Sequence, residues 1–459
     1  MLSLRQSSLF VSPFVSAVRS VIGDVRVMET IATARSIASS SSRALASRVS
    51  RRPSSRARWV TFSTSSTSLT SASMRTLDES RGGGSRTEIT FVRHGQSTWN
   101  AEGRIQGSSD ASTLTEKGRE QAESTRALLA LDEFDACLRS PLKRASETAE
   151  IVWGNRKRSG EDGASDPFVD VVDLREIDLY AFEGLLKEEG VEKFGEEYMN
   201  WKKRPGDFEI DGHYPVRELW DRATSVWENV LTRQSHKRLL VVAHNAVNQA
   251  LLGSALGLGP HYFRRLLQSN CAVSKVIIDK DFEPNTGRGV SLEIFNQTLD
   301  IPLGEKKTIV LIPEATSIEE EVKITAGVMK VLKKTTVGAL LHGPDGAAVR
   351  MAEKLFNRCS REVEGGCPFE LQVVNSVEDV LANEGACDRG EGSTFVIHEK
   401  RLCQEFIARA MGIDSGEVFN LTPGGITIIN MKGGPAQDPV VVCVNHLLHI
   451  SNEPDCEFH

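Results

Sequence analysis

Several features that would identify common kinds of protein are missing from this sequence of 459 residues. No apolar run approaches the roughly 20 residues that a membrane-spanning helix needs, so we predict no transmembrane span. The Cys-x-x-Cys and His-x-x-x-His spacings of metal sites are absent, as is the Gly-x-x-x-x-Gly-Lys-Ser/Thr loop of nucleotide-binding proteins. We therefore expect chemistry that uses no metal and no other cofactor, and the missing loop argues against a bifunctional kinase.

A regular cysteine pattern is missing too. The eight cysteines lack the repeated spacing of a disulfide framework, which favours a reducing compartment. Cys137 and Cys271 are candidates for redox control, although we expect both to be buried free thiols.

Lysine is absent from the first 77 residues, whose only acidic residues are Asp24 and Glu29. Arginine recurs there among serine, threonine and alanine, a composition typical of an organellar transit peptide. We assign residues 1–85 to this peptide and a linker ending in Gly-Gly-Gly-Ser; a disordered serine-rich tail is the alternative. The composition alone fits a mitochondrion as well as a chloroplast.

The rest of the chain is acidic. The net charge is −7 although the leader is basic, so the residues beyond the leader carry a larger negative charge. This charge argues against nucleic acid or an anionic membrane as a partner. An anionic substrate must therefore be attracted by a local cluster of arginines.

Arg93 and His94 directly follow 88–92, a short apolar run that predicts a buried strand. Ligands of open α/β sheets bind at the carboxyl ends of such strands. There an arginine can hold a phosphoryl group while the imidazole attacks phosphorus. Arg-His-Gly alone is a weak motif, so the prediction depends on the residues that follow it.

A second predicted strand, 134–138, leads through Pro141 into a predicted helix at 142–153. Arg144 lies in the first turn of this helix, near its positive end, and can provide a second phosphate contact. The alternative is a solvated arginine on the helix surface. A further helix is predicted from Thr115 to Ala130, with Thr115 as its cap.

Glu176 and His244 complete the candidate set. Glu176 lies in a turn, where a carboxyl is often only a solvated loop residue, but a sugar-phosphate leaving group needs a proton donor of this kind. His244 ends the apolar strand 239–243 and precedes a predicted helix at 246–256; a structural histidine is the alternative. Two histidines at strand ends, two arginines and a carboxyl form a coherent phosphoryl-transfer set.

These residues and several longer runs resemble the histidine phosphatase superfamily, also called the phosphoglycerate mutase-like family. The resemblance is strong over about 86–300, and the longer runs that carry it are 173–180, 211–220, 244–252 and 267–271. It implies a phosphohistidine at His94, phosphoryl oxygens held by Arg93, Arg144 and His244, and proton transfer by Glu176. It also implies that Asn100, Arg104 and Gln106 line the phosphate or substrate pocket.

The resemblance implies a three-layer α/β/α domain with a mostly parallel sheet over 86–300, as the alternation of strands and helices also predicts. The longer runs are closest to plant chloroplast phosphatases of sugar-acid phosphates. That implies the chloroplast stroma as location and 2-carboxy-D-arabinitol 1-phosphate, a Rubisco inhibitor, as substrate, with only an indirect link to Rubisco itself. Xylulose 1,5-bisphosphate hydrolysis, a phosphoglycerate mutase and a non-catalytic scaffold are the alternatives. The short stretch between Glu176 and His244 favours a phosphatase over a mutase.

Two departures from the family pattern concern the substrate more than the reaction. Many relatives have Gly-Glu-Ser where this chain has His213-Tyr214-Pro215, and a glycine where it has Asn245. We expect the loops 180–186 and 210–217 to shape the substrate pocket.

The second half echoes the first, which predicts a degenerate, inactive copy at 306–459. The run 308–316 parallels the first strand, with Ile312 and Pro313 at the positions of Arg93 and His94, and Ala347 replaces Arg144. His398 is predicted to match His244 but to lack a partner, in a structural or surface role. This half is expected to pack on the active domain, to shape its pocket or to form a dimer surface of a homo-oligomer.

Overall fold

The computed structural model describes residues 86–156, 166–299, 308–362, 369, 371–384, 392–432 and 438–450. The predicted transit peptide and linker, residues 1–85, lie outside these ranges. Within them, no helix has the length and apolar character needed to cross a membrane, and no group of three or more His, Cys, Asp or Glu side chains is arranged to hold a metal ion.

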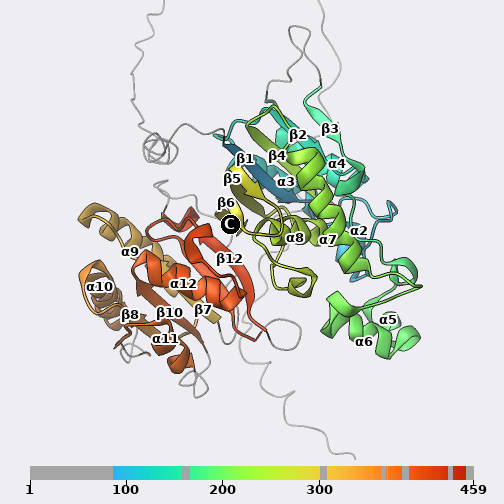
Figure 1. The fold of residues 1–459 in the computed structure, drawn as a ribbon. Coiled ribbons are helices and arrows are strands. Elements are labelled where there is room, and N and C mark those ends of the chain that lie inside the picture. Colours follow the sequence, from blue (N-terminus) through green and yellow to red (C-terminus); the bar gives the residue numbers. More distant parts are fainter. Residues whose placement is uncertain are drawn as a thin grey trace, which may run out of the picture. The chain divides into compact units, whose positions relative to one another are not determined.

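The N-terminal half, residues 86–299, alternates strands and helices (Figure 1). Its strands are β1 (Thr87–Arg93), β2 (Ala136–Arg139), β3 (Phe168–Asp170), β4 (Arg238–Ala243), β5 (Val273–Glu283) and β6 (Arg288–Gln297). Its helices are α2 (Thr98–Glu102), α3 (Glu116–Leu128), α4 (Lys143–Trp153), α5 (Lys187–Phe194), α6 (Glu196–Lys203), α7 (Pro215–Val226) and α8 (Asn245–Ala255).

The C-terminal half, residues 308–450, is built in the same way. Its strands are β7 (Thr308–Pro313), β8 (Val337–His342), β9 (Leu371–Val373), β10 (Ser393–His398), β11 (Ile426–Asn430) and β12 (Val440–His446). Its helices are α9 (Ile318–Leu332), α10 (Gly346–Glu362), α11 (Val377–Glu384) and α12 (Lys400–Met411).

All these strands belong to one sheet, in the order β3-β2-β4-β1-β5-β6-β12-β11-β7-β10-β8-β9. In each half three neighbouring pairs are parallel and two are antiparallel. If the strands of each half are numbered from its own first strand, both halves have the order 3-2-4-1-5-6. The sixth strands, β6 and β12, are neighbours at the centre of the sheet, so the two orders run outward from them in opposite directions. The mostly parallel α/β architecture predicted for the N-terminal half is confirmed.

The sheet of the N-terminal half is buried on both faces. Ile89 and Phe91 of β1 belong to the core formed with α7 and α8, whereas Val92 belongs to the core formed with α3 and α4. Successive strand side chains point to opposite faces, so a strand covered on both sides is apolar throughout. The apolar runs therefore mark the central strands, as predicted.

Helix starts also follow the sequence closely. The Thr115 side chain accepts a hydrogen bond from the Gly118 amide and caps α3, as predicted. α4 begins at Lys143, so Arg144 lies in its first turn. The first strand, the 142–153 helix and the strand before His244 are each placed to within one or two residues.

The predicted alignment of the second half is wrong by one residue. His94 donates its backbone N–H to the Ala243 carbonyl at 3.0 Å, and the equivalent bond runs from Glu314 to the His398 carbonyl at 2.8 Å. Glu314, not Pro313, therefore occupies the position of His94, and His398 that of Ala243. His398 is buried and does have a partner, because its Nε2 lies 3.2 Å from the Val374 carbonyl oxygen.

Candidate active site

His94 is held in one tautomer at the carboxyl end of β1. Its side chain is buried, and Nδ1 lies 2.7 Å from the Gly95 carbonyl oxygen. A carbonyl can only accept, so Nδ1 carries the hydrogen and Nε2 presents its lone pair. That is the form a nucleophilic imidazole requires.

Gly95 lets α3 approach this strand end. A Cβ atom on Gly95 would lie 2.2 Å from the Gly118 carbonyl oxygen, and one on Gly118 would lie 2.1 Å from the Gln96 carbonyl oxygen. Neither backbone position has room for a side chain. The glycine of Arg-His-Gly is thus required by packing.

Arg144, which is buried, and Arg93, which is half-buried, are cations anchored by backbone carbonyls. Arg93 Nη1 donates to the Gln268 carbonyl at 2.6 Å. Arg144 donates to the carbonyls of Ser109 (2.7 Å) and Gly107 (2.9 Å). Burial lowers the pKa of Arg93 to about 10, against the opposing effect of nearby Glu176, so the guanidinium stays charged at neutral pH. Two fixed positive charges therefore face the region of His94.

His244, at the start of α8, is the second buried histidine. Its ring centroid lies 5.0 Å from that of His94, and its Nε2 lies 2.7 Å from Ser140 Oγ. Burial, and then the charge of Arg144, lowers its pKa well below the ordinary value. The pKa of His94 is lowered in the same direction by burial, then by Arg93 and Arg144. Both imidazoles are neutral at pH 7.

Three buried nitrogens of this cluster have no hydrogen-bond partner among the described residues: Arg93 Nε, Arg144 Nε and His244 Nδ1. An unpaired buried donor costs about 1–3 kcal/mol. A ligand with several acceptor oxygens, such as a phosphoryl group, would satisfy donors of this kind.

Glu176 lies against the start of α8. Its Oε1 accepts the amides of Ile177 (3.0 Å), Ala246 (3.0 Å) and Val247 (3.2 Å), whereas its Oε2 accepts only that of Ala246, at 3.1 Å. Oε2 therefore keeps the capacity to carry a proton. The predicted solvated alternative is wrong, because Glu176 is buried.

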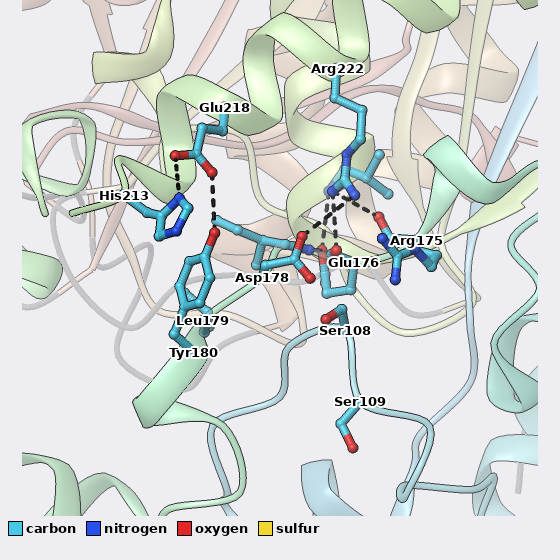
Figure 2. A network of polar contacts seen from close by, with 12 residues as sticks. Ser108, Ser109, Arg175, Glu176, Asp178, Leu179, Tyr180, His213, Glu218 and Arg222 are labelled. Carbon is cyan, nitrogen blue, oxygen red and sulfur yellow. Dashed lines mark hydrogen bonds and ion pairs between the residues drawn. The ribbon is translucent and has the colours of Figure 1, made fainter. Parts of the chain in front are cut away.

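α7 fixes the backbone around Glu176. Arg222 Nη2 donates to the carbonyls of Arg175 (3.1 Å) and Glu176 (3.0 Å), and Nη1 lies 4.0 Å from Asp178 Oδ2 (Figure 2). Burial of the Arg222 side chain lowers its pKa. This contact between segments distant in the sequence holds the carboxylate in place.

The two loops predicted to shape the pocket meet beside Glu176. Tyr180 and His213 stack with ring centroids 4.5 Å apart, at an interplanar angle of 16°. Both bind the Glu218 carboxylate: Tyr180 Oη donates to Oε2 at 3.3 Å, and His213 Nδ1 lies 3.1 Å from Oε1 (Figure 2). The motif that departs from the family pattern thus forms a polar rim joined to α7.

The three predicted pocket residues Asn100, Arg104 and Gln106 make different contacts. Asn100 Nδ2 donates to Gln106 Oε1 at 3.0 Å, and Gln106 Nε2 is buried without a partner among the described residues. Arg104 instead binds Glu102 (2.6 Å) and the Gly184 carbonyl (2.8 Å). The structure shows no direct contact between the described side chain of Arg104 and His94.

Besides Arg222, sequence reasoning missed three residues that touch this cluster. Ser140 binds His244; Gln268 accepts from Arg93; and Asn270 Nδ2 donates to the His94 carbonyl at 3.0 Å. Gln268 and Asn270 belong to the 267–271 run that carried the family resemblance, and this was the available signal. Ser140 follows a strand next to β4, but serine alone indicates no role.

Cys137 and Cys271 are buried free thiols, as expected. Burial raises the pKa of Cys271 to about 12 and also raises that of Cys137. A buried thiol of this kind is a poor nucleophile.

A neutral nucleophile, two fixed cations and a carboxyl whose Oε2 accepts only one amide form an arrangement for phosphoryl transfer. The model of the histidine phosphatase superfamily (branch 1) matches residues 89–284, which carry all of these groups.

Relatives of this chain include two plant phosphatases and a bacterial probable phosphoglycerate mutase. A probable 2-carboxy-D-arabinitol-1-phosphatase of Arabidopsis thaliana is 58% identical over 218 residues, 47% of this chain and 42% of the relative, so the chain spans under half of that protein's length. The 2-carboxy-D-arabinitol-1-phosphatase of Triticum aestivum is 37% identical over 445 residues, 79% of this chain and 86% of the relative. A probable phosphoglycerate mutase GpmB of Citrobacter koseri is 33% identical over 193 residues, 41% of this chain and 84% of the relative. Because the similarity to the wheat protein extends over most of both chains, this chain belongs to the histidine phosphatase superfamily.

Proposed function

We propose that this chain hydrolyses phosphate monoesters of small sugars or sugar acids through a phosphohistidine at His94. The observation that carries the proposal is the neutral His94 ring, whose Nε2 lone pair is free while Arg93 and Arg144 supply charge beside it. Membership of the histidine phosphatase superfamily supports the same chemistry.

The proposed reaction has two displacements at phosphorus. His94 Nε2 attacks, the bond from phosphorus to the sugar oxygen breaks, and Glu176 gives its proton to the departing alkoxide. Water then attacks the phosphohistidine, the phosphorus–nitrogen bond breaks, and Glu176 takes the proton of that water. Arg93, Arg144 and His244 bind the phosphoryl oxygens throughout and stabilise the charge that develops on them. Neither step requires a metal ion.

The proposed substrate is 2-carboxy-D-arabinitol 1-phosphate. Support comes from the two plant relatives, whose names give this activity. We propose Asn100, Arg104, Gln106 and the rim of Tyr180, His213 and Glu218 as substrate contacts. Removal of this Rubisco inhibitor would place the protein in the chloroplast stroma, with residues 1–85 as its transit peptide.

We further propose that residues 306–459 are an inactive copy of the catalytic domain at 86–300. The shared strand order supports a copy. The loss of chemistry is supported by Pro313, Glu314 and Ala347, which replace Arg93, His94 and Arg144 in the hydrogen-bond frame.

The test is phosphate release from a panel of esters without added metal. The panel contains 2-carboxyarabinitol 1-phosphate, xylulose 1,5-bisphosphate, 2- and 3-phosphoglycerate and 2,3-bisphosphoglycerate. We expect preference for the first ester, loss of activity in His94→Ala, and acid-labile label on the wild type but not on the variant. Interconversion of phosphoglycerates would identify a mutase, and no label with any turned-over ester would contradict the phosphohistidine.

A further inference from the structure

The segment 265–271, here called the strap, fixes the backbone of Arg93 and His94 and the side chain of Arg93. Its Gln268 carbonyl accepts from Arg93 Nη1 at 2.6 Å, and Asn270 Nδ2 donates to the His94 carbonyl at 3.0 Å. The Cys271 amide donates to the Arg93 carbonyl at 3.1 Å. A displacement of the strap would therefore move both Arg93 and His94.

The other end of the strap is bound to the C-terminal half. The Leu267 amide donates to the Val441 carbonyl at 3.0 Å, and the Val441 amide donates to the Arg265 carbonyl at 2.9 Å. The Arg265 guanidinium adds bonds to the carbonyls of Ala410 (2.8 Å) and Pro439 (3.1 Å). The C-terminal half thus holds the start of the strap through β12 and the end of α12.

Asn296 of β6 joins the strap and β12 directly. Its Oδ1 accepts the Ser269 amide at 2.7 Å, and its Nδ2 donates to the Val442 carbonyl at 2.7 Å. The residue is fully buried and has a φ of +53°, a left-handed conformation that asparagine tolerates better than most residues. Its amide is positioned to make both bonds at once.

In the C-terminal half, Asn445 makes contacts equivalent to those of Asn296 by an approximate twofold rotation. Its Oδ1 accepts the Thr422 amide at 2.9 Å, its Nδ2 donates to the Glu293 carbonyl at 2.7 Å, and its φ is +57°. Phe295 and Val444, which precede the two asparagines, are paired across the β6–β12 contact. The two halves therefore meet as the subunits of a symmetric dimer do, through the same surface on both sides.

The two halves differ in the residues at the strand ends that these contacts hold. The segment after Thr422 leads to Gly424, whose amide donates to the Pro313 carbonyl at 2.8 Å, next to Glu314. Asn296 thus braces a strand end with a nucleophile, and Asn445 braces one without.

We propose that the C-terminal half positions the catalytic groups of the N-terminal half, with Asn296 and the strap as the positioning elements that connect β12 to Arg93 and His94. This inference rests on the proposed function, because it assumes that Arg93 and His94 act on phosphate esters. It assigns the C-terminal half a role in catalysis although that half touches no reacting atom.

The test compares Asn296→Gly with Asn445→Gly in the full chain. Glycine accepts the positive φ of both sites, so each variant loses the side-chain bonds of its asparagine, three at Asn296 and four at Asn445, without backbone strain. The measurements are melting temperature, affinity for inorganic phosphate by calorimetry, and kcat and KM for p-nitrophenyl phosphate. We expect similar losses of melting temperature. Only Asn296→Gly should weaken phosphate binding and lower kcat, each by about tenfold, which corresponds to about 1.4 kcal/mol.

Equal effects of the two variants on phosphate affinity and kcat would overturn the proposal, as would an unchanged Asn296→Gly enzyme. Inorganic phosphate reports on the site whatever the natural substrate is. If the wild type binds no phosphate and turns over no ester, the proposed function itself fails, and that result is distinct from equal variants of an active enzyme. A second variant, Arg265→Ala, should lower kcat in the same direction, because it removes the side-chain bonds of the strap to Ala410 and Pro439.

Discussion

The carboxyl ends of β1 and β7 share one hydrogen-bond frame but differ in charge. His94 and Glu314 each donate a backbone N–H to the neighbouring parallel strand, at 3.0 and 2.8 Å. The guanidinium groups of Arg93 and Arg144 lie near His94, whereas the matching positions near Glu314 are Pro313 and Ala347. One strand end is cationic with a nucleophile, and the other is anionic without one.

Glu314 places a carboxylate at the strand end of the C-terminal half that matches His94 in the hydrogen-bond frame. Its Oε2 accepts the Ala348 amide at 2.7 Å, at the start of α10. A carboxylate at a helix N-terminus accepts hydrogen bonds from the free amides and interacts favourably with the positive end of the helix dipole. The same carboxylate repels a phosphate, which would otherwise bind at such a helix end. The same backbone therefore supports opposite electrostatics, so phosphoryl chemistry depends on a few side chains and not on the fold.

The largest expected effect is on kcat, and it should differ between variants of the two strand ends. His94→Ala should lower kcat by more than about 10⁴-fold, because it removes the nucleophile. Glu314→Ala should leave kcat unchanged and cost about 1 kcal/mol of unfolding free energy, because only a helix cap is lost. Steady-state kinetics and urea unfolding of both variants check this, and comparable kinetic losses would contradict the assignment of the two sites.

The proposed proton transfer by Glu176 can be tested by comparing two esters whose leaving groups differ in their need for a proton. Glu176→Gln should lower kcat for a sugar phosphate by about 10²–10⁴-fold, the usual contribution of a general acid or base. The loss should be smaller for p-nitrophenyl phosphate, whose leaving group needs no proton in the first step. Parallel kinetics with the two esters measure the difference. An equal loss with both would indicate that Glu176 only holds the start of α8.

Much of the N-terminal half could be predicted from the sequence, because local signals determine it. Apolar runs mark the buried strands and Thr115 marks a helix start. His94 and His244 directly follow strands, and Arg144 lies in the first turn of a helix. The predictions for His94, Arg93, Arg144, Glu176 and His244 are consistent with one cluster in the structure. Their roles stay predictions.

The remaining features depend on contacts between distant segments. The alignment of the second half failed by one residue because 309–312 is apolar throughout, so a strand buried on both faces does not reveal its register. The bonds of Asn296 to the strap and to Val442 join segments 27 and 146 residues apart. No local pattern in the sequence marks such a contact.

The buried histidines predict how stability depends on pH. The pKa of His94 lies well below its ordinary value, so below about pH 6.5 the unfolded chain binds more protons than the folded one. Stability is therefore lost as pH falls below 6.5, with a slope that approaches about 1.4 kcal/mol per pH unit for each such histidine. In the C-terminal half, burial and then His446 lower the pKa of His449 to about 4.

His94→Gln should accordingly reduce the pH slope of the unfolding free energy by about 1 kcal/mol per unit between pH 6.5 and 5.5, where the unfolded histidine gains most of its proton. His449→Gln should reduce it by a similar amount in that window. Urea unfolding at several pH values measures both slopes. A slope that His94→Gln leaves unchanged would mean that His94 is charged in the folded protein, and a charged ring cannot attack phosphorus.

The smallest expected effect tests the hydroxyl that orients His244. Ser140 Oγ lies 2.7 Å from His244 Nε2, whereas the equivalent positions in the C-terminal half are Gly343 and the exposed Glu399. Ser140→Ala removes one hydrogen bond worth about 1 kcal/mol, so kcat should fall roughly fivefold. Ser393→Ala is the matched control, because Ser393 is a buried serine of β10 whose hydroxyl has no partner among the described residues. Equal kcat values in the two variants would show that packing, and not the Ser140 hydroxyl, sets the orientation of His244. Ser140 would then differ from Gly343 without contributing to the reaction.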